Sequence, residues 1–438
     1  MPRHLTRTRD ATNCPSESHV HARSLRDARV ATCASRQNRT CTCVSSRSWC
    51  ATKTRGLASL GAALLMMIMV ASCSDAGPPA PRETTRELSW SRIALPESVV
   101  VSSLAPTSGA LLVGGNASSD RGHPVLFVVD ASGDTRLVPL HPTSPYAKVA
   151  DLVSVAAHGT QVVALGAKHG GAHANVRWTV WTGSTQRLAE YPQPFETFGG
   201  QSAGGLLGIV ITPDRPVIAG TWAASEGGLD AAVWLPDGRR WMRQESDGTA
   251  LANTQQIQVN PRAASAAGSA VIISGSVITF GDGAEQRAAI WTWPTRSSAW
   301  MLQQLPDAGI HSEALSSRCV QTCWVSGHAD GRLALWSFDL AHVAESATRD
   351  STLPSLEINT NGPGPRTVLS GGRPGILFSH AGSTRLLVSD GHNGWQIFTA
   401  PAGSVVDATT VGDRLYAIIR TDDTVGLWTA DLATTRAR

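Results

Sequence analysis

One pattern recurs along the chain after residue 88. An apolar strand ends in Gly, a polar loop follows, and then come a second apolar strand, a tight turn and a further strand. The residues aligned at the centre of the second apolar strand are Val128, Trp181, Trp234, Trp291, Trp336, Val388 and Trp428, with spacings of 53, 53, 57, 45, 52 and 40 residues. Repeats of about 50 residues built from short strands are typical of β-propeller blades. We therefore predict an all-β fold, a β-propeller of seven four-stranded blades, with six or eight blades as the alternatives.

The two ends of the repeat predict how the ring closes. The last copy stops at residues 428–432 and leaves no room for a fourth strand. Residues 88–96 supply a strand that resembles residues 299–306, with a Trp near its start and a terminal Leu-Pro. An N-terminal strand that completes the last blade would hide two sheet edges. The tryptophans themselves suit the space between neighbouring sheets, so we expect core residues there and not a platform for a ligand.

The segment before the repeats predicts export. Lys53 and Arg55 precede an almost wholly apolar run over residues 56–70, which ends in Val70-Ala71-Ser72-Cys73. A run of about 15 apolar residues is short for a bilayer span and suits a signal peptide. The small residues before Cys73 resemble the bacterial lipobox, which implies that Cys73 is lipidated and becomes the first residue of an exported protein on the outer face of the cell membrane. The alternatives are a buried helix or the signal of a soluble secreted protein.

These features divide the chain into four parts. Residues 1–44 contain Cys14, Cys33, Cys41 and Cys43 without apolar periodicity, and we interpret them as a disordered or untranslated extension; the alternative is a metal-binding extension that uses Cys41 and Cys43. Residues 45–72 are the signal peptide, and residues 73–87, with three prolines, are a lipidated flexible tether. Residues 88–438 form the propeller.

The distribution of charge argues against one class of partner. The first 72 residues hold 11 Lys and Arg against 3 Asp and Glu, whereas residues 73–438 hold 26 against 31. A protein that binds nucleic acid needs a dense basic face. We therefore expect no nucleic-acid partner for the propeller.

Two hairpins carry a family resemblance. Residues 233–241 read Val-Trp-Leu-Pro-Asp-Gly-Arg-Arg-Trp, and residues 388–395 read Val-Ser-Asp-Gly-His-Asn-Gly-Trp. Asp-Gly between apolar strands is a strong turn signal, and the following Trp makes both hairpins resemble a degenerate Asp-box of sialidase-like (BNR-type) propellers. In that family the motif is structural and implies no catalysis. The chain has no Arg-Ile-Pro segment at the first blade, and its three tyrosines lie outside any recognisable context of that family.

Two cysteines lie within the propeller. Cys319 and Cys323 fall where the first strand of the fifth blade turns into the second. Two nearby thiols in an exported domain predict a disulfide, and a hairpin brings their Cβ atoms within range.

Polar side chains gather in the predicted loops between the second and third strands of the blades. Such loops share a face with the connections between blades, and loops on a rigid scaffold often bind ligands. The candidate ligand face consists of Asp120, Arg121, His123, His169, His173, Asp282, Glu285, Arg287, His328, Asp330 and Arg332. Histidine and carboxylates could hold Zn or Cu or sense acidity. Neighbouring blades are, however, separated by far more than a metal–ligand bond of about 2 Å, so we predict no metal and no cofactor.

These features favour a non-catalytic surface module. We expect a lipid-anchored monomer that presents its face or central funnel to a protein, peptide or glycan. The chain has no phosphate-binding Gly loop, Gly-x-Ser-x-Gly elbow or His-Glu-x-x-His motif. The alternative is a cell-envelope glycoside hydrolase or lyase, for which two carboxylates roughly 5–9 Å apart would have to face the funnel. Its acid/base pair would come from Asp151, Asp282, Glu285, Asp330 and Asp422.

Overall fold

The structure is a computed structural model. It describes residues 85–435 except 97, 119–121, 171–174, 282, 295–298, 393 and 423. The predicted extension (1–44), signal peptide (45–72) and lipidation site Cys73, and all but the last residues of the tether, therefore lie outside the described residues. Within the described part of the chain, no helix is long and apolar enough to cross a membrane.

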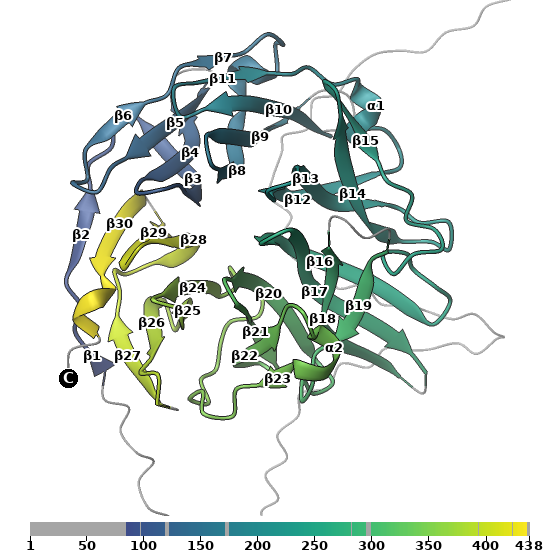
Figure 1. Cartoon of the computed structure of the whole chain (residues 1–438), viewed down its shortest axis with the longest axis vertical. Helices are drawn as coiled ribbons and strands as arrows, with labels where there is room; N and C mark the ends of the chain where they lie inside the picture. Colours follow the sequence, from purple (N-terminus) through teal and green to yellow (C-terminus); the bar gives the residue numbers. More distant parts are fainter. Residues whose placement is uncertain are drawn as a thin grey trace, which may run out of the picture. The chain divides into compact units, whose positions relative to one another are not determined.

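The described residues form seven sheets arranged in a ring, each built on four antiparallel strands, so the predicted seven-bladed β-propeller is confirmed (Figure 1). In each blade the first strand lies at one end of the sheet and faces the centre of the ring. Blade 1 consists of β3 (Val99–Pro106), β4 (Leu111–Ala117), β5 (His123–Val129) and β6 (Thr135–Leu137). Blade 2 consists of β8 (Asp151–His158), β9 (Gln161–His169), β10 (Val176–Ser184) and β11 (Arg187–Glu190). Blade 3 consists of β12 (Ala203–Ile211), β13 (Pro216–Ala223), β14 (Leu229–Asp237) and β15 (Arg240–Arg243).

The remaining four blades follow the same order. Blades 4 and 5 consist of β16 (Ile257–Ala267), β17 (Ala270–Phe280), β18 (Ala284–Pro294) and β19 (Met301–Gln304); and β20 (Ser312–Cys319), β21 (Thr322–Ala329), β22 (Arg332–Asp339) and β23 (Thr348–Arg349). Blades 6 and 7 consist of β24 (Arg366–Ser370), β25 (Arg373–His380), β26 (Ser383–Ser389) and β27 (Trp395–Thr399); and β28 (Ser404–Val411), β29 (Arg414–Arg420), β30 (Val425–Asp431) and the N-terminal β2 (Trp90–Ile93).

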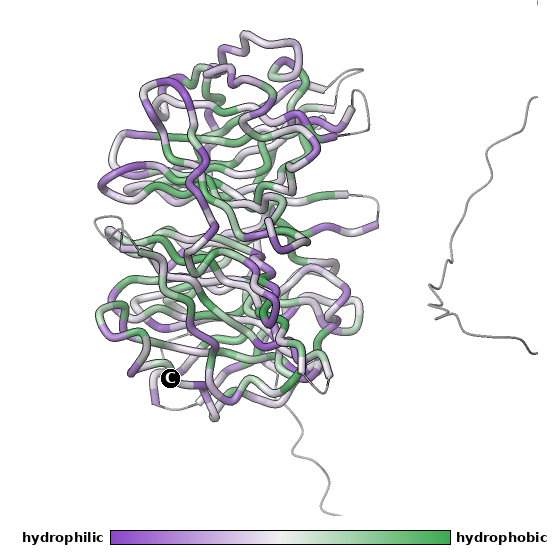
Figure 2. Tube along the Cα trace, turned by 90° about the vertical axis from the view of Figure 1, so that its right-hand side faces the viewer, coloured by the Kyte–Doolittle hydropathy of each residue, from purple (hydrophilic) through white to green (hydrophobic). Residues whose placement is uncertain are grey.

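Helices are few and short, and two further strands extend blades at their outer edges. The helical elements are η1 (Ala147–Val149), α1 (Phe195–Phe198), α2 (Val343–Ser346) and η3 (Leu432–Thr435). β7 (Leu140–His141) pairs in parallel with β11 of blade 2, and β1 (Thr85–Arg86) pairs in parallel with β27 of blade 6. The sheet therefore already includes two residues of the segment that the sequence assigns to the tether. Apolar stretches follow the strands, and polar ones concentrate in the turns and connections (Figure 2).

The N-terminal strand closes the ring as predicted. β2 pairs antiparallel with β30, in a register that places Ile93 opposite Leu427 (Figure 1). Ile93 is buried, and the indole N–H of Trp90 donates to the Thr399 carbonyl of blade 6 at 3.0 Å. The first and last strands of the propeller thus complete one sheet, which leaves neither edge unpaired at the junction.

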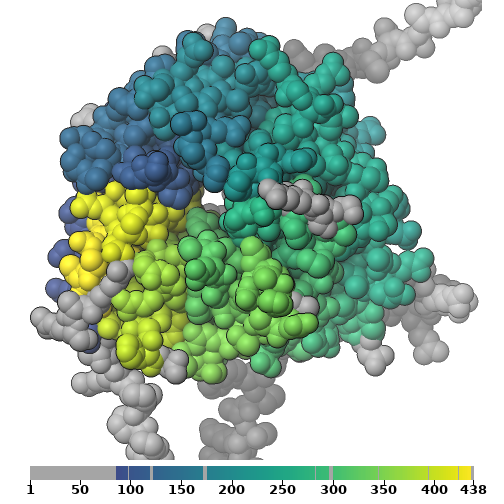
Figure 3. All heavy atoms as spheres, in the orientation of Figure 1, coloured from purple at the N-terminus to yellow at the C-terminus, as the bar shows by residue number. Residues whose placement is uncertain are grey.

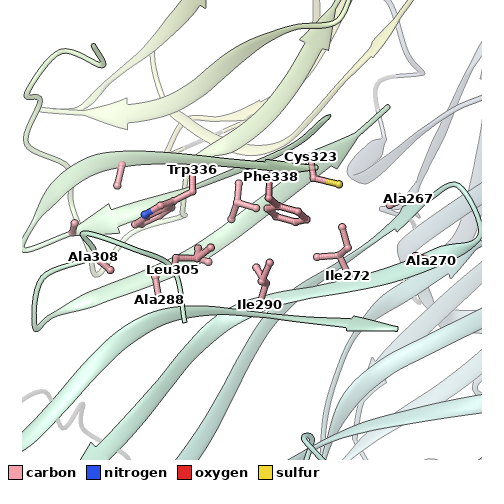
Figure 4. Packing of buried hydrophobic residues seen from close by; sticks show 14 residues of the cluster. Ala267, Ala270, Ile272, Ala288, Ile290, Leu305, Ala308, Cys323, Trp336 and Phe338 are labelled. Atoms are coloured by element: carbon pink, nitrogen blue, oxygen red, sulfur yellow. The ribbon is translucent and has the colours of Figure 1, made fainter. Parts of the chain in front are cut away.

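The repeated tryptophans pack between blades, as expected for core residues. Trp181, Trp234, Trp291 and Trp336 are at most 1 % exposed, and each faces the preceding blade. Figure 4 shows this arrangement for Trp336, which packs with Phe338 of its own strand against Ile290 of blade 4. In three blades the indole N–H also donates, at 2.8 Å, to a carbonyl in the connection from the preceding blade. The acceptors are Thr197, Ala250 and Pro306.

The sequence alignment is one residue out of register in two blades. Val128 packs towards blade 2 and Val388 towards blade 7, so both face the following blade. The residues that face the preceding blade are their neighbours, Phe127 and Leu387. Successive strand residues point to opposite faces, so a shift of one residue exchanges the two sides of the blade. Without a Trp to mark the position, the apolar runs in these two strands offer no basis for choosing between them.

The predicted disulfide is present. Cys319 and Cys323 are directly opposite each other in the β20–β21 hairpin, with a Cα–Cα distance of 4.1 Å, and their Sγ atoms are bonded. Both predicted Asp-Gly turns also connect a third strand to a fourth. In the second, one carboxylate oxygen of Asp390 accepts from the backbone N–H groups of His392 at 2.7 Å and Gly394 at 2.9 Å.

Candidate functional site

A channel runs through the centre of the ring and holds a cavity of about 450 Å³. Residues from the first strands of all seven blades line it, and Figure 3 shows its opening between the blades. These strands have no sheet partner on the side of the channel. The wall therefore combines backbone edges with small, apolar and arginine side chains.

Irregular pairing brings particular side chains to this wall. In six of the seven first strands, the ladder with the second strand skips a residue, and in β12 (Ala203–Ile211) a further irregularity precedes it. A β-bulge of this kind redirects the extra residue, and all six extra residues line the channel. They are Ser102, Val153, Leu207, Arg262, Leu315 and Val406.

The residue after the bulge connects neighbouring blades. Ser154 Oγ accepts from the backbone N–H of Ile209 at 3.0 Å, and Ser316 Oγ accepts from that of Thr367, also at 3.0 Å. Asp407 Oδ2 accepts from the N–H of Leu104 at 2.8 Å, which connects blade 7 to blade 1. These bonds satisfy backbone donors that no sheet partner reaches.

Two arginines give the channel a local positive charge on the side of blades 5 to 7. Arg366 donates Nε and Nη2 to the Val406 carbonyl at 3.1 and 2.9 Å. Arg318 lies near Asp407 and donates Nη2 to the Ala408 carbonyl at 3.4 Å. Burial lowers the pKa of the Arg318 guanidinium, Asp407 raises it and Arg366 lowers it. Two cations beside one carboxylate leave the wall suited to an anion.

The third arginine of the channel, Arg262, is neutralised by Glu313. Its Nε and Nη2 reach the two carboxylate oxygens of Glu313 at 2.8 and 3.1 Å. Asn260, Ser276 and Gln286 also donate to Glu313, which is 4 % exposed. A buried carboxylate is tolerated when its lone pairs are satisfied in this way. The cluster joins blades 4 and 5 and was not expected from the sequence.

The predicted ligand face is only partly brought together. Asp120, Arg121, His173 and Asp282 lie outside the described residues. His123 and His169 are exposed on blades 1 and 2, and Glu285 and Arg287 form an ion pair of 2.8 Å on blade 4. Among the members that the structure describes, three lie together on blade 5: His328, Asp330 and Arg332.

Two members of the blade 5 group have local partners. Asp330 occupies a positive-φ turn position (φ 49°) and accepts from the His311 N–H at 3.1 Å, whereas Arg332 donates to Ser355 Oγ. His328 is buried, with its Nε2 4.0 Å from a carboxylate oxygen of Glu313.

In the part of the chain that the structure describes, the channel wall contains no carboxylate pair of the kind that glycoside chemistry needs. Asp407 is the one carboxylate among its described lining residues. Asp151, Glu285, Asp330 and Asp422, proposed from the sequence as acid/base candidates, do not line it, and Asp282 lies outside the described residues. Nor do the described His, Cys, Asp and Glu residues include a group of three that could hold a metal ion.

His328 predicts a pH dependence of stability. Burial lowers its pKa below the ordinary value of 6.5; Glu313 and Asp330 act in the opposite direction, and Arg262 acts in the same direction as burial. The unfolded chain therefore binds this proton at a higher pH than the native protein, and the free energy of unfolding falls as pH drops below about 6.5. Chemical denaturation should show that, between pH 7 and pH 5, the free energy of unfolding of His328→Gln falls less than that of the wild type. The exposed control, His158→Gln, should follow the wild type; parallel curves for all three proteins would contradict the prediction.

The channel residues were missed because no local motif marks them. The one usable signal is an arginine or an apolar residue within most of the first strands, and it becomes informative only when the bulges are known. Arg318 and its acceptor Ala408 are 90 residues apart in the chain.

Comparison with known proteins identifies the fold. No family model matches the sequence, and no curated protein matches it. Among solved structures, the chain is similar to a puromycin-hydrolysing peptidase of Mycobacterium tuberculosis, with 13 % identity, a TM-score of 0.50, and coverage of 81 % of this chain and 55 % of that one. It is also similar to the β-propeller domain of the Trilobed protease from Pyrococcus furiosus, with 9 % identity, a TM-score of 0.48, and coverage of 76 % and 96 %.

A sialidase of Trypanosoma rangeli is a further structural neighbour, with 12 % identity, a TM-score of 0.40, and coverage of 78 % of this chain and 55 % of that one. The chain thus spans about half of the length of the peptidase and the sialidase. At these identities the likeness concerns architecture alone. The seven blades are shown by the sheet topology, and the comparisons add a likeness in fold and leave the activity open.

Proposed function

We propose that this protein is an exported, lipid-anchored propeller that binds an acidic peptide in its central channel without catalysing a reaction on it. The observation that carries the proposal is the composition of the channel wall. Arg318 and Arg366 line the wall with one carboxylate, Asp407, whose two oxygens accept from the backbone N–H groups of Leu104 and Ala408. An anion is favoured there, and a carboxylate held by backbone donors is poorly placed to exchange protons with a substrate.

The backbone edges of the channel favour a peptide as the ligand. The first strand of each blade presents an edge without a sheet partner, and an extended peptide can add hydrogen bonds to those edge groups that side chains of the channel do not already engage. The guanidinium of Arg366 uses two of its five N–H groups on Val406, so it can still donate to a carboxylate.

Calorimetric titration with acetylated tetraglutamate amide tests binding in the channel, with tetraglutamine as the uncharged control. We expect the acidic peptide to bind, and Arg366→Gln to weaken binding about tenfold, since a charge-assisted hydrogen bond is lost. Arg420→Gln, an exposed arginine outside the channel, should bind as the wild type does. Equal binding of both peptides, or unchanged binding to Arg366→Gln, contradicts the proposal, and cleavage of the peptide would indicate an enzyme instead.

The anchor is tested separately through Cys73. We expect Cys73→Ser to move the protein from the membrane fraction to the soluble fraction, because the thiol that would carry the lipid is absent. Ser74→Ala, one residue away, should remain with the membrane. Immunoblots of fractionated cells and mass spectrometry of the N-terminal peptide provide the measurement. A Cys73→Ser protein that stays in the membrane fraction rules out this anchor.

A further inference from the structure

A second cavity, of about 310 Å³, lies in blade 2 and shares no lining residue with the channel. Three segments bound it: the start of β10, the residues just before η1, and the connection from β11 that contains α1. Figure 1 shows α1 beside β10 and β15, the strands that it contacts. None of the predicted site residues lines it.

Six aromatic and proline side chains line this cavity. They include Tyr146, Trp178, Phe195 and Phe198, together with Pro192 and Pro194. Phe198 is buried against Trp234 of blade 3, with ring centroids 5.7 Å apart. Phe195, in contrast, is 48 % exposed. Its ring lies at the rim of the cavity and is not part of the buried core. Walls of this kind suit a flat, apolar body.

One cation enters this apolar cavity. The guanidinium carbon of Arg177 lies 4.1 Å from the ring centroid of Phe195 and 5.6 Å from that of Tyr146, so it stacks on both rings. Its Nη1 is buried and has no hydrogen-bond partner among the residues that the structure describes. Lys168 lies directly opposite Arg177 in the β9–β10 ladder and adds positive charge. A buried guanidinium N–H without an acceptor costs free energy, which a bound anion would recover.

The carboxylate that lines the same cavity as Arg177 already accepts hydrogen bonds from other residues. Glu190 lines the cavity and is buried, and its Oε2 accepts from the N–H of Thr143 and the N–H of Ser144, both at 2.7 Å. The Thr143 hydroxyl also donates to Oε2, at 2.8 Å, and the Ser144 hydroxyl donates to Oε1 at 2.6 Å. Glu190 therefore holds the segment before η1 in place, and among the described residues no carboxylate forms an ion pair with Arg177.

We propose that the blade 2 cavity is a binding site for a small organic carboxylate with a flat apolar body. The carboxylate accepts from Nη1 of Arg177, and the body packs on the ring of Phe195 and the other aromatic walls. This site is independent of the channel and goes beyond the proposed function.

Ligand-observed NMR and calorimetry of the purified full-length protein test the proposal, with phenylacetate as the probe and phenylacetamide as its uncharged analogue. We expect phenylacetate to bind at millimolar concentrations or below and phenylacetamide to bind at least tenfold more weakly. Arg177→Gln should weaken phenylacetate binding tenfold or more and leave tetraglutamate binding unchanged. Arg187→Gln, an exposed arginine at the other end of blade 2, should bind as the wild type does.

A further variant covers the case in which Arg177→Gln does not fold. Phe195→Leu changes a half-exposed residue and removes one of the two rings on which Arg177 stacks, so we expect a folded protein with several-fold weaker binding. The proposal is overturned if phenylacetate does not bind the wild type, if the amide binds equally well, or if the variants at Arg177 and Phe195 bind as the wild type does.

Discussion

Replacing Ile93 by Asp should lower the free energy of unfolding by about 3–5 kcal/mol. Ile93 is 7 % exposed and packs with Val101, Phe127 and Tyr416 at the junction of blades 7 and 1. The substitution removes apolar volume and places an unpaired carboxylate in that cluster. The whole stability of a domain is typically about 5–15 kcal/mol, so a loss of this size should be visible as a large shift in the denaturation midpoint.

Ser91→Asp is the matched control for this prediction. Ser91 lies on the same strand, two residues earlier, and is exposed. Introducing the same carboxylate there should change the free energy of unfolding by no more than about 0.5 kcal/mol. Equilibrium unfolding in urea, followed by circular dichroism, compares the two variants. Equal stabilities would mean that β2 does not hold the ring closed.

Trp291→Ala should cost about 3–5 kcal/mol of unfolding free energy. Trp291 is fully buried between blades 3 and 4, and its indole N–H donates to the Ala250 carbonyl at 2.8 Å. The substitution leaves a cavity between two sheets and a carbonyl without its donor. Trp291→Phe keeps most of the ring volume and loses the hydrogen bond, so its cost should be nearer about 1 kcal/mol.

The equivalent position in blade 7 provides the comparison. Trp428 faces the preceding blade as Trp291 does, but its side chain is only partly buried. Trp428→Ala should therefore destabilise the protein clearly less than Trp291→Ala, because less apolar area returns to water. If urea denaturation shows the same loss of unfolding free energy for both substitutions, burial between blades does not explain how the tryptophans stabilise the protein.

The aligned strand positions show where the local sequence pattern determines which residue faces the preceding blade, and where it does not. Trp181 and Trp336 were aligned correctly, because one large aromatic residue marks the position. Val128 and Val388 were placed one residue away from their true equivalents, Phe127 and Leu387. Both faces of these strands are buried, so hydrophobicity does not alternate along them and carries no information about register.

The residues of the candidate sites are much harder to predict from the sequence than the fold is. The sequence predicts His328 and Asp330 in or beside the loop between the second and third strands of blade 5. Asp330 does lie in this turn, whereas His328 lies on β21 and is buried beside Glu313. Arg177 was not selected at all. Its environment depends on Tyr146 and Phe195, which lie before and after it in the chain and meet it only when the connections fold back over blade 2.

The all-β class, the number of blades, the closure by residues 88–96 and the Cys319–Cys323 disulfide all follow from the order of residues along the chain. Each depends on a repeat, a turn or a hairpin, whose partners are close in sequence or recur at a regular spacing. The channel and the blade 2 cavity were decided by tertiary structure. Arg366 reaches Val406 across 40 residues and Arg318 reaches Ala408 across 90. Such contacts arise because blades that are adjacent in the ring are about 50 residues apart in the chain, and no local pattern specifies which of their side chains meet.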